Sequence, residues 1–197
     1  CIIDRFSSTS HSFSDLFILL YATVVLVLEA EWGLTYAELQ WLSVPGFVVF
    51  GFGAPVCGWL GDRWSTTGMM AVFFFGLGFA SILTGFADSP VTLLIGLTTM
   101  GAFAAIYHPV GIPWLVKNSR VPTRALGING VFGSLGTAFA ALVAATLAQK
   151  FGWRAAFFVP GGVSILVGGA FIWTMMLGRI VDAETDLKPQ PQPVPGD

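Results

Sequence analysis

The sequence predicts an all-α membrane protein with six transmembrane helices. Of its 197 residues, 55% are hydrophobic and 10% are charged, whereas soluble domains carry about 25% charged residues. The apolar residues form long uninterrupted runs and lack the alternation that is typical of strands in a membrane barrel. So few charges cannot cover a surface that faces water, and we therefore expect the chain to lie in a lipid bilayer.

Short polar joints divide the apolar sequence into six stretches of membrane-crossing length. A helix needs about 20 mostly apolar residues to cross the hydrocarbon core. Five of the stretches contain no Asp, Glu, Lys or Arg, and the first contains only Asp15 and Glu29. We predict an N-terminal segment at 1–11, a bundle at 12–179 and a tail at 180–197, with helices at residues 12–30, 39–60, 66–87, 90–116, 125–149 and 154–178.

The basic residues indicate how the helices are oriented. Lys and Arg favour the cytoplasmic side of a membrane. If the N-terminus lies inside, seven basic residues lie inside and only Lys150 and Arg154 lie outside. We therefore expect both termini in the cytoplasm, most simply across the inner membrane of a bacterium. The tail at 180–197 is polar and rich in proline, which is typical of a linker or an unstructured end.

Several functional classes find no support in the sequence. The net charge of −2 gives no reason to expect binding to nucleic acid, and Cys1 and Cys57 form neither a disulfide framework nor a metal-binding spacing. The sequence contains no haem-attachment motif, P-loop, HExxH motif or dinucleotide fingerprint. We therefore predict no catalytic residues, no metal, no cofactor and no enzymatic activity.

The stretch YHPVG, residues 107–111, interrupts the fourth predicted helix. Pro109 and Pro113 lack an amide donor, so each leaves a carbonyl one turn earlier without its helical partner, and Gly111 lies between them. Irregular backbone persists inside a membrane only where protein buries it or where it lines a cavity. Because transporters place such breaks at binding sites, we predict a functional kink or local unwinding here.

Ionisable side chains lie in this break and near the start of the first span. His108, which follows Tyr107, titrates near neutral pH, and His11 and Asp15 share one face of a helix because they are four residues apart. An acid within a span needs a partner or a wet cavity. These four residues are candidates for substrate contact or proton coupling. Alternatively, Asp15 caps the first helix and His108 bonds a carbonyl freed by Pro109.

Two turns carry further candidate motifs. In GWLGDRWSTTG, Gly58 permits close helix packing, and Asp62 precedes the third span, where the helix dipole favours a carboxylate. Together with Arg63 it could also form an ordinary polar turn. In FGWRAAFF, Trp153 and Arg154 are expected to anchor the sixth span at the membrane interface.

These motifs resemble those of the major facilitator superfamily. Gly58, Asp62 and Arg63 match half of the signature loop G-x-x-x-D-R-x-G-R-R, which lies between the same two spans, and the GWRxxF turn is similar to one in many members. HSFSD, which spans His11 to Asp15, and the YHPVG stretch resemble the fosmidomycin-resistance-like branch.

The resemblance implies the N-terminal six-helix half of a twelve-helix fold. It implies that the loop at Asp62 and Arg63 acts as a gate that pairs with the other half. It also implies that the first and fourth spans line a central cavity, which would bring Asp15 and His108 together. The expected partners are the lipid bilayer, a small-molecule substrate, and a second six-helix half or another membrane subunit.

The fifth predicted span contains glycine at every third position. Small residues allow a second helix to approach closely. We therefore predict a tight helix seam along Gly127, Gly130, Gly133 and Gly136.

The function that these observations favour is transport. We expect half of a transporter, or a fragment of one, that moves a small organic molecule or anion by alternating access, with the proton as the candidate coupling ion. The alternative is a membrane subunit that does not transport and that packs against a larger complex.

Overall fold

The computed structural model describes residues 2–180, and within that range the chain is helical with no strand. The elements are α1 (Ile2–Trp32), α2 (Tyr36–Trp41), α3 (Val44–Arg63), α4 (Thr66–Gly85), α5 (Pro90–Ala104), the π-helix η1 (Tyr107–Gly111), α6 (Ile112–Asn118), α7 (Pro122–Phe151) and α8 (Ala155–Met176). Six helical units are long and apolar enough to cross a membrane. In this count α2 and α3 form one unit, and α5, η1 and α6 form another. The predicted fold class is confirmed.

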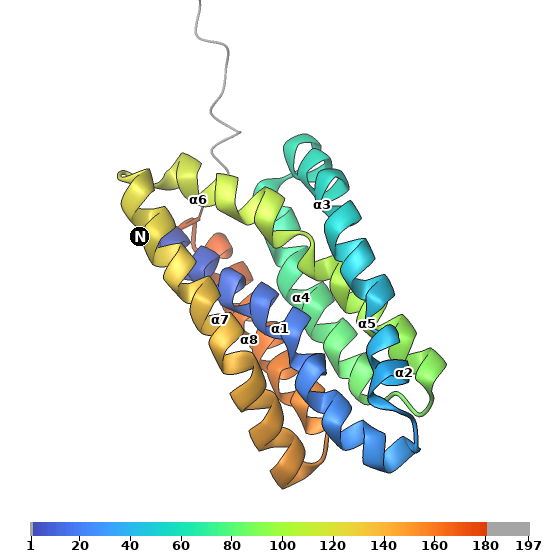
Figure 1. Ribbon diagram of the computed structural model, residues 1–197. Coiled ribbons are helices and arrows are strands. Elements are labelled where there is room, and N and C mark those ends of the chain that lie inside the picture. Colours follow the sequence, from blue (N-terminus) through green and yellow to red (C-terminus); the bar gives the residue numbers. More distant parts are fainter. Residues whose placement is uncertain (1, 181–197) are drawn as a thin grey trace, which may run out of the picture.

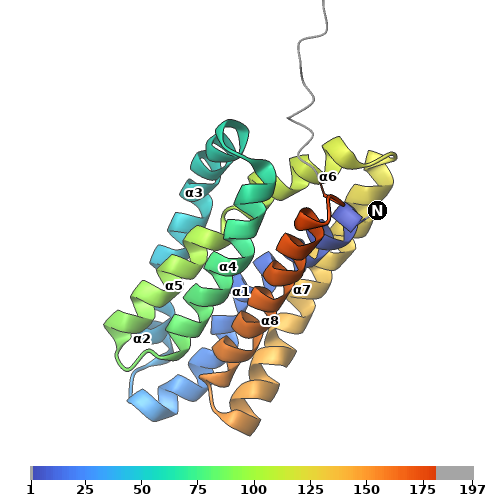
Figure 2. The same cartoon turned by 180° about the vertical axis from the view of Figure 1, so that it is seen from behind.

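The six units run side by side in one bundle (Figure 1). The principal contacts are those of α1 with α7, of α4 with α8 and α5, and of α3 with α5. Figures 1 and 2 both show the start of α1, the α3–α4 turn, the α6–α7 turn and the end of α8 at one end of the bundle. The other three joints lie at the opposite end, as a chain that crosses a membrane six times requires.

The first helix begins ten residues earlier than the predicted span. We predicted a separate segment at 1–11, whereas α1 runs continuously from Ile2 for 31 residues, or about 46 Å. Its early serines are polar by composition, but Ser7 and Ser10 are fully buried, and the Ser10 hydroxyl donates to the carbonyl of Phe6 at 2.8 Å. Hydropathy placed the boundary too late because the bundle itself buries these hydroxyls.

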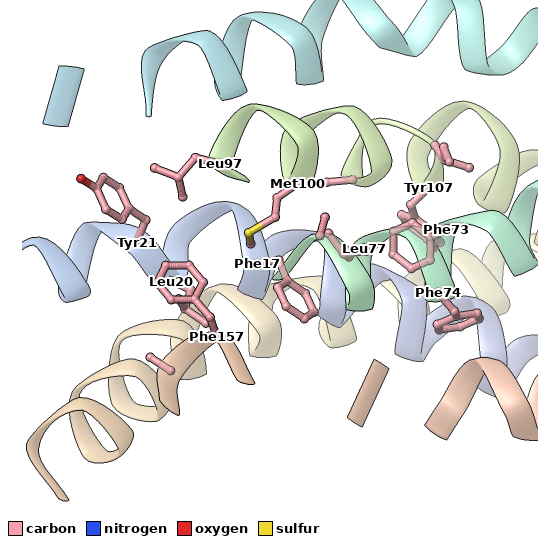
Figure 3. Packing of buried hydrophobic residues seen from close by; sticks show 14 of the residues in the cluster. Phe17, Leu20, Tyr21, Phe73, Phe74, Leu77, Leu97, Met100, Tyr107 and Phe157 are labelled. Carbon is pink, nitrogen blue, oxygen red and sulfur yellow. The ribbon is translucent and has the colours of Figure 1, made fainter. Parts of the chain in front are cut away.

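A cluster of aromatic and aliphatic side chains fills the bundle (Figure 3). Phe73 and Phe74 of α4 pack edge to face at 5.3 Å between ring centroids, and Phe6 of α1 contacts Phe171 of α8 at 5.1 Å. Hydroxyl groups join the same helices, because Ser164 donates to the carbonyl of Phe74 at 2.8 Å. Packing and hydrogen bonds of this kind hold helices together in lipid, where the hydrophobic effect between them is weak.

Glycine allows α1 and α7 to approach closely, but at only two of the four predicted positions. A β-carbon on Gly136 would lie 2.3 Å from the carbonyl oxygen of Ser12, and one on Gly133 would overlap the imidazole of His11. A β-carbon on Gly127 or Gly130 would meet nothing within 4 Å. The four-glycine seam needs correction because a three-residue repeat drifts about 60° per step around a helix, so Gly127 and Gly136 face opposite sides.

The turn before α8 also differs from the expectation. We predicted Trp153 as an interfacial anchor, but its side chain is 1% exposed and packs against Trp32 at 5.9 Å between centroids. Arg154 covers the Trp153 ring at 4.4 Å, lies 3.4 Å from Glu31 and donates to the carbonyl of Ala87 at 3.4 Å. Arg154 therefore links the end of α1 and the end of α4 to the start of α8. The predicted tail at 180–197 lies outside the described residues, apart from Ile180.

The α1–α7 contact predicts opposite effects for two alanine substitutions in α7. Gly136→Ala is expected to lower the stability by about 1–3 kcal/mol, because the methyl group would overlap the Ser12 backbone. Gly127→Ala, the matched control, is expected to raise it by up to about 1 kcal/mol through helix propensity. Thermal unfolding of both variants in detergent measures the difference, and equal effects would contradict the close approach.

Candidate functional site

The fourth span widens at the YHPVG stretch. α5 ends at Ala104, η1 spans Tyr107–Gly111, and α6 continues the same unit from Ile112. A π turn holds one residue more than an α turn, which gives the proline ring space beside the preceding turn. The amide of Val110 still donates to the carbonyl of Ile106 at 3.2 Å. The predicted irregularity is therefore a π-helix within a continuous unit, and not an unwound segment.

Three polar side chains from three helices meet behind this π-helix. Ser7 of α1, Tyr107 of η1 and Asn129 of α7 are at most 2% exposed. The amide nitrogen of Asn129 donates to the Tyr107 hydroxyl at 2.8 Å and to the Ser7 hydroxyl at 3.2 Å. Ser7 Oγ in turn donates to the carbonyl of Gly111 at 3.3 Å. Because each group has partners, a polar network is stable at this depth.

Asn129 also determines the tautomer of His11. The Nδ1 atom of His11 lies 2.8 Å from Asn129 Oδ1 and 3.0 Å from the Asn129 backbone carbonyl oxygen. Both oxygens only accept hydrogen bonds, so Nδ1 must carry the hydrogen. The neutral ring therefore presents the lone pair of Nε2, which lies 3.7 Å from Asp15 Oδ2.

The predicted pair of Asp15 and His108 does come together. One ring nitrogen each of His11 and His108 and a carboxylate oxygen of Asp15 lie within 4.8 Å of one another. The two imidazole rings meet edge to face at 5.2 Å, and the ring of Phe50 covers His108 from α3 at 5.9 Å. The side chains of His11 and Asp15 are 15% and 24% exposed, so the cluster is only partly buried.

Two glycines near the end of α3 contact the π-helix directly. A β-carbon on Gly58 would lie 3.3 Å from the Pro109 ring, and one on Gly61 would lie 3.0 Å from Val110. Asp62 and Arg63 are exposed at the end of α3, where the Arg63 guanidinium lies 4.9 Å from the Trp59 ring. The signature turn and the polar cluster are therefore joined by packing through Pro109 and Val110.

Asp62 precedes the third span, as predicted, but it does not lie at the N-terminus of α4, where the helix dipole would favour a carboxylate. It lies in the last turn of α3, and α4 starts at Thr66 with Ser65 as its N-cap. The Ser65 hydroxyl accepts the amide hydrogen of Gly68 at 2.9 Å. The N-terminal dipole of α4 is therefore capped by a hydroxyl group, because serine can adopt the extended cap conformation that this short turn requires.

Sequence reasoning overlooked Ser7 and Asn129. Ser7 lies before the apolar stretch that marked the first span, so it was assigned to a polar segment. Asn129 lies between Gly127 and Gly130 of the fifth span, and this stretch was interpreted as a helix-packing seam. An amide within a span is itself a signal, because it needs hydrogen-bond partners when it is buried in a membrane.

The fold and the site together define a class of protein: a six-helix membrane bundle with an ionisable cluster beside a broken span. The chain matches the model of the Major Facilitator Superfamily over residues 6–195. It therefore belongs to this family of integral membrane proteins.

Curated relatives are transporters and resistance proteins. The chain is 26% identical over 160 residues to puromycin resistance protein pur8 of Streptomyces alboniger, covering 78% of this chain and 32% of that protein. It is 28% identical over 148 residues to the niacin transporter NiaP of Acinetobacter baylyi, covering 74% and 34%. It is 30% identical over 144 residues to a probable 4-methylmuconolactone transporter of Cupriavidus pinatubonensis, covering 70% and 34%. The matched part spans about a third of each relative.

The buried network predicts a large cost for removing its amide. Asn129→Ala is expected to lower the stability by roughly 1–3 kcal/mol, because the polar groups of Tyr107, Ser7 and His11 lose a buried partner. Asn118→Ala is the control, since Asn118 makes one partly exposed bond to the carbonyl of Trp114. Unfolding temperatures in detergent test the comparison, and a loss no greater than that of the control would contradict the network.

Proposed function

We propose that this chain is the N-terminal six-helix half of a carrier that moves a small organic molecule or anion by alternating access. The observation that carries the proposal is the cluster of His11, Asp15 and His108, which lies within the spans and beside a π-helix. Ionisable side chains are costly at this depth and are usually functional. We further propose that the chain belongs to the fosmidomycin-resistance-like branch, on the basis of HSFSD and YHPVG.

A second six-helix half would complete the carrier. The chain spans about a third of the relatives' length. A protein as long as these relatives would have room for a second six-helix half. The outer side of α3 also offers large apolar side chains that are at least 46% exposed, namely Phe47, Val48, Phe52, Val56 and Trp59. Lipid or a second half can cover this surface. In the proposed cycle the two halves rock about the cluster, while the turn at Gly58, Asp62 and Arg63 acts as the gate.

The names of the relatives support the proposed substrate class. They refer to puromycin, niacin, 4-methylmuconolactone and, for a probable transporter of Cupriavidus necator, sulfoacetate. Each is a small organic molecule, and several carry an acidic group. These four compounds therefore form a rational first panel for transport assays in proteoliposomes.

Tyr107 and the cluster supply the proposed coupling chemistry. His11 and Asp15 share a face of α1, and His108 approaches them from η1, so the three groups lie within 4.8 Å, a separation that one bridging water molecule can span for proton transfer. The hydroxyl of Tyr107 donates to Asn129 Oδ1, which also accepts from His11, and the two aromatic rings lie 5.0 Å apart, so Tyr107 helps to position the imidazole of His11. A proton that is bound in one stage of the transport cycle and released in the other would change the charge of the cavity.

The coupling proposal predicts a specific pH phenotype. His108→Ala is expected to flatten the dependence of transport on pH between about pH 5 and 8, where an imidazole changes charge. Thr98→Ala is the control, because Thr98 lies in the same span and its hydroxyl donates to the carbonyl of Leu94 in its own helix. Uptake into proteoliposomes at clamped pH is the measurement. An unchanged profile in the histidine variant would overturn the coupling role.

We also propose that both termini face the cytoplasm of a bacterium. The support is the excess of basic residues at the end of the bundle that holds the α3–α4 and α6–α7 turns. In a Cys57→Ser background without Cys1, a membrane-impermeant thiol reagent is expected to label Asp88→Cys in intact cells. The same reagent should label Val121→Cys only after lysis. The reverse pattern would show the opposite orientation.

A further inference from the structure

We propose that His11, Asp15 and His108 form a binding site for a divalent transition-metal ion of the Zn²⁺, Co²⁺ or Ni²⁺ class. One potential ligand atom from each residue lies within 4.8 Å of the other two. The sequence predicted no metal, since Asp15 and His108 lie 93 positions apart and no metal-ligand spacing links them. Only the packing of α1 against η1 brings the three donors together.

The donor set indicates which ions would bind. Two imidazole nitrogens with one carboxylate oxygen suit divalent transition metals, and the same combination occurs in catalytic zinc sites. Calcium and magnesium prefer ligand sets made of oxygen atoms alone. A site with three protein ligands also keeps one position for water, which the partial exposure of His11 and Asp15 allows.

The surroundings of His11 match those of a metal ligand. The Nδ1 hydrogen is held by the two oxygens of Asn129, which leaves the lone pair of Nε2 beside Asp15. Metal-bound histidines usually donate their second ring hydrogen to an oxygen atom, which sets the tautomer and the ring orientation. The absence of a side chain at Gly133 makes room for this ring, since a β-carbon there would lie 2.6 Å from Nε2.

His108 supplies a second, independent observation. Its Nδ1 atom is buried and has no hydrogen-bond partner among residues 2–180. A buried nitrogen without a partner is unfavourable. A metal ion that binds through this nitrogen would use its lone pair. A bound ion with bonds of about 2.0–2.1 Å needs ligand atoms about 3.3 Å apart, so small side-chain rotations would close the present arrangement.

The inference goes beyond the proposed carrier function and can be tested without transport. Metal binding requires neutral imidazoles and an ionised carboxylate, so protons would compete with the ion. An ion at this position would also connect α1 to the π-helix. Direct binding measurements can therefore succeed or fail independently of whether transport is coupled to protons.

The first experiment is a Co²⁺ titration of tag-free protein in detergent, followed by visible absorption and by competition with Zn²⁺. We expect one ion per chain with the d–d spectrum of nitrogen and oxygen ligands. His108→Ala and Asp15→Asn should abolish this signal. Asn129→Ala should weaken binding about 10–100-fold, because it removes the group that orients His11. Asp88→Asn is the control, and it removes an exposed acid of the α4–α5 turn without changing binding.

The second experiment avoids variants that fail to fold. Both histidines of this chain belong to the cluster, so an imidazole-specific acylating reagent reports on the site in the unmodified protein. Zn²⁺ is expected to protect both residues, with mass spectrometry of the peptides as the readout. Modification of both at the same rate with and without Zn²⁺, or a Co²⁺ signal that persists in His108→Ala, would overturn the proposal.

Discussion

The need to satisfy every polar group inside the membrane governs this structure. Hydrocarbon offers no hydrogen bonds, so backbone and side-chain groups must find partners within the bundle. Helices meet this demand for most of the backbone. Serine hydroxyls form hydrogen bonds between helices, as when Ser81 donates to the carbonyl of Phe157 at 2.7 Å. Tyr107 and Asn129 satisfy each other's polar groups, and their network fixes the position of the fourth span against α1 and α7.

The same constraint explains the form of the break in the fourth span. An unwound segment would leave several carbonyls without partners, whereas a π-helix keeps the chain helical and bypasses the proline ring. The widened turn also directs Tyr107 into the bundle and places His108 next to His11 and Phe50. The residue that perturbs the helix, Pro109, thus also sets the geometry of the ionisable cluster.

The close packing of α3 on this turn has a mechanical consequence. Gly58 and Gly61 lie against Pro109 and Val110, so a movement of the proposed gate would press on the π-helix without an intervening flexible layer. Packed interfaces of this kind shift between discrete arrangements and do not deform continuously. The cluster and the signature turn would then respond as one unit, whether a proton, a substrate or a metal ion occupies the site.

The sequence by itself determined the six spans, the break at YHPVG and the candidate residues His11, Asp15, Tyr107 and His108. It could do so because charge-free length, proline and ionisable groups within spans are local signals whose cost in lipid does not depend on the fold. The start of α1, the burial of Trp153 and the limited glycine seam depend on which neighbour covers each surface. Only the tertiary structure decided these, and only it revealed that Ser7 and Asn129 complete the site, because hydrogen bonds between residues 122 positions apart exist only once the helices have packed.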